Sequence, residues 1–265
     1  MPQLPRTAVR LATLVAAAAL LPLAGCGGRP VAPAGATPPR AAAPAATPSK
    51  PPITTWNGLA MLPPPPVPKV KPLKLPAGRA TLFRQVPTED KVVFITIDDG
   101  WTKDPKFAQM VKDLNIPISV FLTNDAIKDD YGYFKRFQET GVALQNHTMT
   151  HPNLKKLSAA AQRREICGPQ SIYQRQYGAA PKLFRPPFGN YNATTLKVAG
   201  ECGLRGVVLW GATLPGSDLY GPVKPGQIIL THFRKKLVPH FIDMVKGIQA
   251  KGYRVARLED YLEIQ

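Results

Sequence analysis

The stretch Val92-Val93-Phe94-Ile95-Thr96-Ile97-Asp98-Asp99-Gly100 joins a hydrophobic run to an abrupt polar end. The run is short and rich in β-branched residues, so it predicts a buried strand over Val92–Ile97. Its apolar character on both faces is typical of a parallel sheet that is covered on both sides. In such folds the chemistry lies where strands end and loops begin, so Asp98 and Asp99 predict a site at that edge.

Further apolar runs alternate with amphipathic stretches along residues 81–265. The predicted strands are 118–123, 142–146, 182–184, 206–210, 227–231 and 253–257, and the predicted helices are 105–114, 133–140, 158–177, 193–202 and 239–251. This alternation predicts a parallel α/β sheet or barrel. We therefore expect one globular catalytic domain over residues 81–265.

Two histidines follow the predicted strand 142–146. His147 and His151 are four residues apart, and a single helical turn would place both on one face, within reach of one metal ion. Asp98 or Asp99 could supply a third ligand, and a His-His-carboxylate set leaves coordination positions open for catalysis. The alternatives are a polar Asp-Gly turn and two separate surface histidines.

An arginine and a third histidine end two more predicted strands. Arg185 precedes two prolines that stiffen the chain, and its guanidinium could hold a carboxylate through paired hydrogen bonds. His232 follows the strand 227–231 and is a candidate for proton transfer. Taken alone, Arg185 is better explained as a surface arginine and His232 as a structural histidine. Their shared position at the ends of predicted strands favours one common site.

Taken together, the motifs resemble those of the NodB-like polysaccharide deacetylases, carbohydrate esterase family 4. The resemblance spans roughly residues 88–262 and rests on five motifs in order: Asp98–Gly100, His147–His151, Arg185–Gly189, Trp210 and Leu230–His232. It implies a distorted (β/α)7 barrel that hydrolyses N-acetyl or O-acetyl groups on a cell-surface or extracellular polysaccharide. Peptidoglycan, a chitin-like oligomer, an exopolysaccharide and acetylated xylan all remain open as substrates.

The resemblance also implies a role for each residue. Three side chains would bind one divalent metal, expected to be zinc with cobalt or nickel as alternatives: Asp99, His147 and His151. Asp98 would be the catalytic base, Arg185 would orient it, and His232 would be the catalytic acid. The backbone N–H of Phe188 would stabilise the oxyanion. Two further side chains would line the pocket for the acetyl methyl group: Trp210 and Leu230.

One departure from the family pattern concerns the expected acid. The family usually has an Asp a few residues after the position of Trp210, where it supports the histidine. Here the chain runs Gly211-Ala212-Thr213-Leu214-Pro215-Gly216-Ser217-Asp218, so the first carboxylate is Asp218. A weakened or inactive sugar-binding pseudo-enzyme on the same fold is therefore the alternative function.

The N-terminus predicts export. Arg6 and Arg10 precede the apolar run Leu11–Leu23, which is too short to span a bilayer comfortably and is typical of a cleaved signal. The run ends in Leu23-Ala24-Gly25-Cys26, which resembles the bacterial lipoprotein box. We expect a signal peptide over residues 1–26, lipidation of Cys26 and a position on the outer face of the bacterial membrane. An ordinary signal peptide with an extracellular product is the alternative.

Residues 27–80 are predicted to be a disordered Pro/Ala-rich spacer, because half of the 30 prolines lie there. The patch Ile53–Met61, which contains Trp56, could dock locally. Residues 1–80 contain nine Lys or Arg and no Asp or Glu, out of a net charge of +17. This thin spread is unlike a nucleic-acid-binding arm, so we expect no nucleic-acid partner.

Two cysteines, Cys167 and Cys202, lie in the predicted globular domain. In an exported protein they could form a disulfide, because the environment is oxidising. Two small buried thiols are the alternative, and the sequence does not decide between them.

Overall fold

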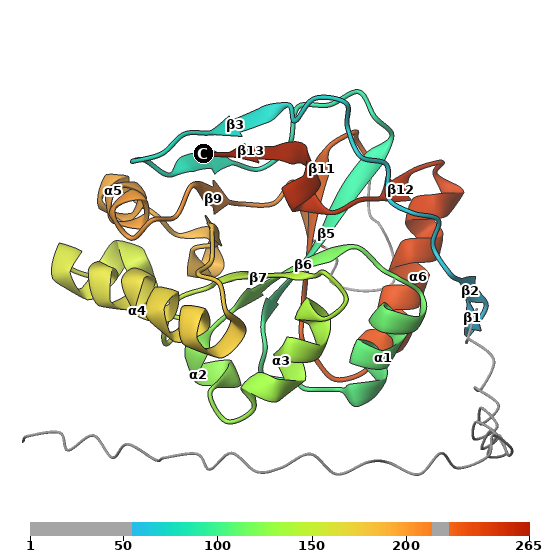
Figure 1. The fold of residues 1–265 in the computed structure, drawn as a ribbon, viewed down its shortest axis with the longest axis horizontal. Coiled ribbons are helices and arrows are strands. Elements are labelled where there is room, and N and C mark those ends of the chain that lie inside the picture. The colour runs from blue at the N-terminus through green and yellow to red at the C-terminus, as the bar shows by residue number, and fades with distance from the viewer. Residues whose placement is uncertain (1–54, 214–222) are drawn as a thin grey trace, which may run out of the picture. The chain divides into compact units, whose positions relative to one another are not determined.

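A parallel sheet of nine strands organises the part of the chain that the computed structural model describes, residues 55–213 and 223–265 (Figure 1). Its strands are β4 (Thr81–Phe83), β5 (Val92–Asp99), β6 (Ile118–Leu122), β7 (Ala143–Asn146), β8 (Leu183–Phe184), β9 (Gly206–Val208), β10 (Ala212–Thr213), β11 (Gln227–His232) and β12 (Arg254–Val255). The order is β10-β11-β5-β6-β7-β8-β9-β4, and β12 pairs with the start of β5. All seven predicted strands are therefore confirmed, with small shifts at their ends.

The sheet curls until its ends meet. β9 pairs with β8, whereas β10, which follows in the chain after residues 209–211, pairs with β11 at the other end of the sheet. A second closure joins Gln85 to Gln227 in an antiparallel bridge. A Cβ at Gly226 would lie 1.9 Å from Val86 O, so this crossing requires glycine. The predicted distorted (β/α)7 barrel is confirmed.

Side chains of β5 alternate between the inside and the outside of the barrel. Phe94 packs with other buried residues of the interior, such as Phe121 and Ile228. Ile95 and Ile97 point outwards into a second core shared with the covering helices. These helices are α1 (Pro105–Asp113), α3 (Tyr131–Gln138) and α6 (Leu237–Ala250), which lie together on one side of the sheet in Figure 1. Every second side chain of β5 therefore points into the barrel, up to the end of the strand where the candidate site lies.

Helices α4 (Ala159–Tyr177) and α5 (Ala193–Glu201) cover another part of the barrel and share a third buried cluster. Ser158 caps α4 by accepting a hydrogen bond from Ala161 N, and Gly178 ends it in a left-handed conformation (φ 80°). Shorter elements are α2 (Asn124–Ile127), η1 (Leu154–Lys156), η2 (Pro187–Gly189) and η3 (Leu258–Tyr261). The five longer predicted helices are all confirmed.

A disulfide joins α4 to the end of α5. Cys167 and Cys202 are bonded, with their Cα atoms 5.1 Å apart. The disulfide alternative is therefore the one that the structure supports.

The prediction of a spacer through Ala80 is wrong for residues 55–80. Strands β1 (Thr55–Trp56) and β2 (Leu59–Ala60) form a hairpin, and Trp56 Nε1 donates a hydrogen bond to Asp113 Oδ2 at 3.0 Å. Local docking of the patch around Trp56 is thus confirmed.

Leucines explain why this proline-rich segment packs. Leu59, Leu62 and Leu75 are buried, whereas most of the intervening residues are exposed. Strand β3 (Leu73–Leu75) pairs in parallel with the C-terminal strand β13 (Leu262–Ile264). The expected spacer is thereby limited to residues 27–54, which lie outside the described residues, as do the signal segment and Cys26.

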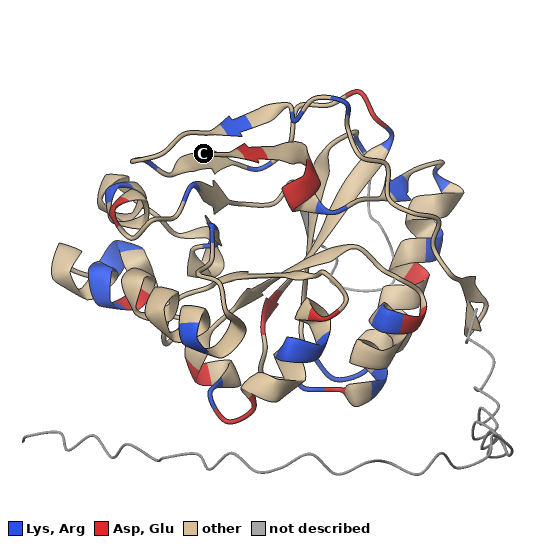
Figure 2. Ribbon diagram, in the orientation of Figure 1, with Lys and Arg blue, Asp and Glu red and all other residues tan. Residues whose placement is uncertain are grey.

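Most charged residues are scattered over the outer helices and loops (Figure 2). Lys and Arg occur on α3, α4 and α6 without gathering on one of them. Within the described residues, no helix is long and apolar enough to cross a membrane.

Candidate active site

Two adjacent carboxylates end β5 and converge on one histidine. Asp98 is 2% exposed, and Asp99 has a left-handed backbone (φ 77°), so the chain turns immediately after the strand. His147 Nε2 lies 3.6 Å from Asp98 Oδ2 and 3.5 Å from Asp99 Oδ1. Adjacent strand residues normally point in opposite directions, and the turn at Asp99 removes that restriction.

The two histidines lie on a loop that follows β7. Thr148 (φ 74°) and His151 (φ 63°) are both left-handed, so the single helical turn predicted over His147–His151 is wrong. The pair still converges, because the loop folds back until the ring centroids are 4.9 Å apart. His151 Nε2 lies 3.4 Å from Asp99 Oδ1.

Asp99, His147 and His151 fit a divalent metal. One donor atom from each lies within 4.8 Å of the others, and the buried Asp99 Oδ1 has no hydrogen-bond partner among the described residues. His147 Nδ1 lies 2.7 Å from Arg185 O, and a carbonyl can only accept, so the ring proton is on Nδ1 and the Nε2 lone pair faces Asp99. Burial lowers the pKa of His147 to about 3, so this ligand is neutral at physiological pH.

Asp98 forms a buried ion pair with Arg185. Arg185 Nη1 donates to Asp98 Oδ1 at 2.6 Å and to Thr96 Oγ1 at 2.9 Å, and its Nε donates to Val208 O at 3.1 Å. The guanidinium also lies 4.2 Å from the ring centroid of Phe121. Burial raises the pKa of Asp98, although Arg185 opposes the shift. The sequence motif predicted this pairing.

His232 lies beside Asp98 across the sheet. The two residues are in register between β11 and β5, and Phe233 N donates to Asp98 O at 3.1 Å. No carboxylate of the described residues lies within ion-pair distance of the His232 ring. Asp218, the first carboxylate after Trp210, lies outside the described residues.

The remaining predicted residues lie around the same end of the barrel. Phe188 is left-handed (φ 59°), and the two turn hydrogen bonds of η2 use the N–H groups of Gly189 and Asn190 rather than its own. The ring of Phe188 lies 4.7 Å from that of His151. Trp210 lies 5.8 Å from the Arg185 guanidinium, and Leu230 is buried two residues before His232.

Two parts of the site were not anticipated from the sequence. Trp101, directly after Gly100, is 57% exposed at the end of β5. Its loop is anchored because Lys103 Nζ donates to Ala126 O at 2.8 Å. Glu165 of α4 accepts hydrogen bonds from the histidine loop. The position of Trp101 close to the two carboxylates in the sequence could have indicated its role. Nothing in the sequence indicated the contact of Glu165 with the histidine loop.

Comparison with known proteins agrees with this geometry. The polysaccharide deacetylase family model matches residues 85–207, which contain the two carboxylates, both loop histidines and Arg185. An uncharacterized protein of Streptomyces coelicolor is 36% identical over 204 residues, or 71% of this chain and 82% of that protein. The chain belongs to the polysaccharide deacetylase family.

Solved structures of other proteins share the fold of this polysaccharide deacetylase family member. A peptidoglycan N-acetylglucosamine deacetylase aligns at 26% identity with a TM-score of 0.63, covering 69% of this chain and 94% of that one. A Bacillus anthracis pseudoenzyme of carbohydrate esterase family 4 aligns at 21% identity and a TM-score of 0.63, covering 70% of each chain. The second likeness concerns the fold alone.

Proposed function

We propose that this chain is a metal-dependent deacetylase that hydrolyses N-acetyl groups, or O-acetyl groups, on a cell-surface or extracellular polysaccharide. One observation carries the proposal: an unpartnered carboxylate oxygen, two histidine nitrogens and a buried Asp98–Arg185 pair meet at the end of β5. Burying this much charge costs stability, and ionisable groups with such perturbed surroundings cluster at functional sites.

The reaction would begin with the removal of a proton from a water molecule. A divalent metal at Asp99, His147 and His151, with zinc expected and cobalt or nickel as alternatives, would acidify water and polarise the acetyl carbonyl. Asp98 would take the proton as the water oxygen forms its bond to the acetyl carbon. Arg185, held on three sides, would keep the carboxylate aimed at that proton.

The reaction would end with a proton given to the leaving group. His232, in register with Asp98, would protonate the sugar nitrogen while the carbon–nitrogen bond breaks, because an amide anion is a poor leaving group. The products are acetate and a free amine. The N–H of Phe188 would stabilise the oxyanion, and Trp210 and Leu230 would line the pocket for the acetyl methyl.

Exposed aromatic rings support a sugar substrate. Trp101 and Phe188, which is 64% exposed, are the aromatic members of the exposed large hydrophobic residues within the described part of the chain. Both adjoin the metal ligands, Trp101 in sequence and Phe188 through the His151 ring. Exposed apolar surface beside a polar site indicates binding, and pyranose rings pack on aromatic faces.

The test is acetate release from a panel of polymers. The protein would be assayed, with and without added Zn²⁺, on peptidoglycan, chitin-like oligomers, an N-acetylated exopolysaccharide and acetylated xylan. We expect release that a chelator abolishes and Zn²⁺ restores. Release from the xylan alone would make the protein an esterase. Metal-independent release would contradict the proposal.

A catalytically weakened or inactive sugar-binding protein is the second candidate. The observation that favours it is the lack of a carboxylate partner for His232 among the described residues. On this alternative the protein would bind metal and oligosaccharide but release little or no acetate from any polymer. Isothermal titration alongside the acetate assay separates the two candidates.

We also propose that the protein is exported and held at the outer face of the membrane through a lipid on Cys26. The motif Leu23–Cys26 after an apolar run supports this, and these residues lie outside the described part of the chain. Cys26→Ser should release the protein from the membrane fraction or leave its signal uncleaved. Unchanged fractionation and processing would contradict the lipid anchor.

A further inference from the structure

The histidine loop needs support from outside itself. Thr148 and His151 are both left-handed, a conformation that is unfavourable for residues other than glycine. Such a backbone persists only when its surroundings fix it. The loop also carries two of the three proposed metal ligands, so whatever fixes it determines the geometry of the site.

Glu165 of α4 supplies much of this support. Its Oε2 accepts hydrogen bonds from Met149 N at 3.1 Å and Thr150 N at 2.9 Å, and its Oε1 accepts one from Thr150 Oγ1 at 2.9 Å. All three donors lie between His147 and His151. The carboxylate therefore binds the middle of the ligand loop without touching the proposed metal ligands.

A proline makes the backbone of α4 available to the same loop. Pro169 lies inside the helix and has no N–H, so the Glu165 carbonyl loses its usual partner four residues on. Met149 N donates to that carbonyl as well, at 3.1 Å. The helix therefore lacks one backbone hydrogen bond between Glu165 and Pro169, and the Glu165 carbonyl binds the loop instead.

Two more contacts join this turn to the loop. Asn146 Oδ1 accepts a hydrogen bond from Thr148 N at 2.8 Å, and Asn146 Nδ2 donates to Ile166 O at 2.8 Å. Met149 packs directly over Gly168, where a Cβ would lie 2.7 Å from the methionine Sδ. Three residues of one helical turn, Glu165, Ile166 and Gly168, therefore contact the loop or the residue that precedes it.

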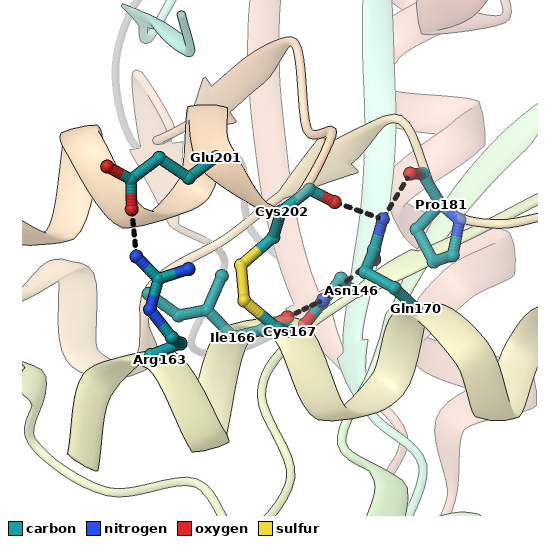
Figure 3. The surroundings of a disulfide bond; sticks show 8 residues. All are labelled: Asn146, Arg163, Ile166, Cys167, Gln170, Pro181, Glu201 and Cys202. Carbon is teal, nitrogen blue, oxygen red and sulfur yellow. Dashed lines mark hydrogen bonds and ion pairs between the residues drawn. A yellow bond between two sulfur atoms is a disulfide. The ribbon is translucent and has the colours of Figure 1, made fainter. Parts of the chain in front are cut away.

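A disulfide joins the same turn of α4 to the end of α5 (Figure 3). Cys167 lies between Glu165 and Gly168 and is bonded to Cys202. Gln170 Nε2 donates to Cys202 O at 3.3 Å and to Pro181 O at 3.0 Å. An ion pair between Arg163 and Glu201 lies one turn earlier.

We propose that Glu165 is a positioning residue for the metal-binding loop, and that the Cys167–Cys202 disulfide holds the helical turn from which Glu165 acts. This inference rests on the proposed function, because it assumes that Asp99, His147 and His151 bind metal. It predicts that metal affinity responds to residues that contact no ligand, and that the disulfide acts on affinity through Glu165.

The first test measures metal affinity of the full protein by competition of Zn²⁺ with a chelator, and the visible absorption spectrum of the Co²⁺ form. Glu165→Ala should weaken affinity by roughly 10–100-fold, as loss of supporting groups around metal ligands does. Glu165→Gln should restore most of it, because an amide can accept from both N–H groups and donate to Thr150 Oγ1. Arg164→Gln, an exposed change on the same turn, is the matched control.

The second test removes the disulfide. Cys167→Ser/Cys202→Ser should weaken Zn²⁺ affinity in wild type and should weaken it less in the Glu165→Ala background, because coupled residues are not additive. If Glu165→Ala does not fold, Thr150→Val removes one of the three bonds and should lower affinity by a smaller factor. Wild-type affinity and Co²⁺ spectrum in Glu165→Ala, or additive effects in the double cycle, would overturn the proposal.

These outcomes are separate from the deacetylase assay. Metal binding that depends on Glu165 without acetate release would support the positioning role and contradict the proposed function. Metal binding that His147→Ala does not change would contradict both the metal site and the positioning role.

Discussion

Each end of the barrel contains a carboxylate withdrawn from solvent, Asp98 fully and Glu259 in part, and their surroundings differ. At the end where β5 stops, Asp98 is paired with a buried cation and lies beside an unpartnered carboxylate oxygen and two histidines. At the opposite end, Glu259 of η3 accepts hydrogen bonds from Ser119 Oγ at 2.7 Å and Gln145 Nε2 at 3.0 Å. The first carboxylate shares its surroundings with groups that are free to react.

Glu259 instead belongs to a closed network of neutral donors. Gln145 Oε1 in turn accepts from Lys182 N and Leu183 N, so this end of the barrel ties η3 to three strands. In barrels of this kind, conserved chemistry belongs to the end where strands stop and the other end contributes to stability. The comparison indicates that the type of partner distinguishes the proposed catalytic carboxylate, Asp98, from the structural one, Glu259.

The largest expected effect is that of Asp98→Asn. Asn keeps an acceptor for Arg185 Nη1 but is not a base, so kcat/KM should fall by roughly 10²–10⁴-fold while metal is retained. The measurement is acetate release together with metal content. Glu259→Gln is the matched change at the other end and should leave kcat/KM unchanged. Equal losses in both variants would break the comparison.

Removing the cation from the buried pair should chiefly reduce stability. Arg185→Met leaves Asp98 buried without its partner, which typically costs about 3–5 kcal/mol of unfolding free energy. Chemical denaturation of the metal-free protein measures it. Arg163→Met, which breaks the exposed pair with Glu201, should cost about 0–1 kcal/mol. A similarly small loss of unfolding free energy in both variants would mean that Arg185 does not stabilise the buried charge of Asp98.

Trp101→Ala should affect substrate binding alone. Loss of an aromatic stacking surface is worth roughly 0.5–1.5 kcal/mol, or about 2–10-fold in KM. We expect kcat and metal content to stay at wild-type values, and Trp101→Phe to recover most of the affinity. Steady-state kinetics on an N-acetylated oligosaccharide measures both parameters. A change confined to kcat would remove Trp101 from substrate binding.

The smallest effect concerns pH and the structural carboxylate. Burial raises the pKa of Glu259, so the folded state holds its proton more tightly than the unfolded state. Unfolding free energy should therefore fall as pH rises from the ordinary pKa of 4.5 through the raised one, and then level off. Glu259→Gln should remove this fall and raise Tm at neutral pH by roughly 2–4 °C per kcal/mol recovered. Glu263→Gln, on a more exposed acid beside Lys74, should do neither.

Strand ends made the reactive half of this comparison predictable from the sequence. The polar residues after the runs 92–97, 142–146, 182–184 and 227–231 had to meet, because parallel strands in one sheet end at the same edge. The motif order then supplied their roles. The alternation of strands and helices predicted a parallel α/β sheet or barrel, and the family resemblance supplied the (β/α)7 barrel.

Other features depend on contacts between segments that are distant in the sequence. Glu165 and Met149 meet only because α4 packs over the loop, and Glu259 meets Ser119 only because the chain returns under the barrel. The left-handed loop over His147–His151 also carries no glycine to indicate it.

Composition misled the interpretation of residues 55–80. Average proline content indicated an extended spacer, yet burial depends on a few leucines at suitable positions rather than on the average. Leu59, Leu62 and Leu75 outweigh the prolines between them because each removes a full side chain from water.

The pairing of β3 with β13 has a consequence for how the chain acquires its fold. Leu73 lies beside Leu262, so β3 pairs with a strand that is synthesised much later than itself. Gln85 and Gln227 are similarly distant in sequence and close the barrel. Pairings of such long range slow folding, because much of the chain must be ordered before they form. Until Leu262–Ile264 has left the ribosome, Leu75 lacks this strand partner, so this part of the fold must form late.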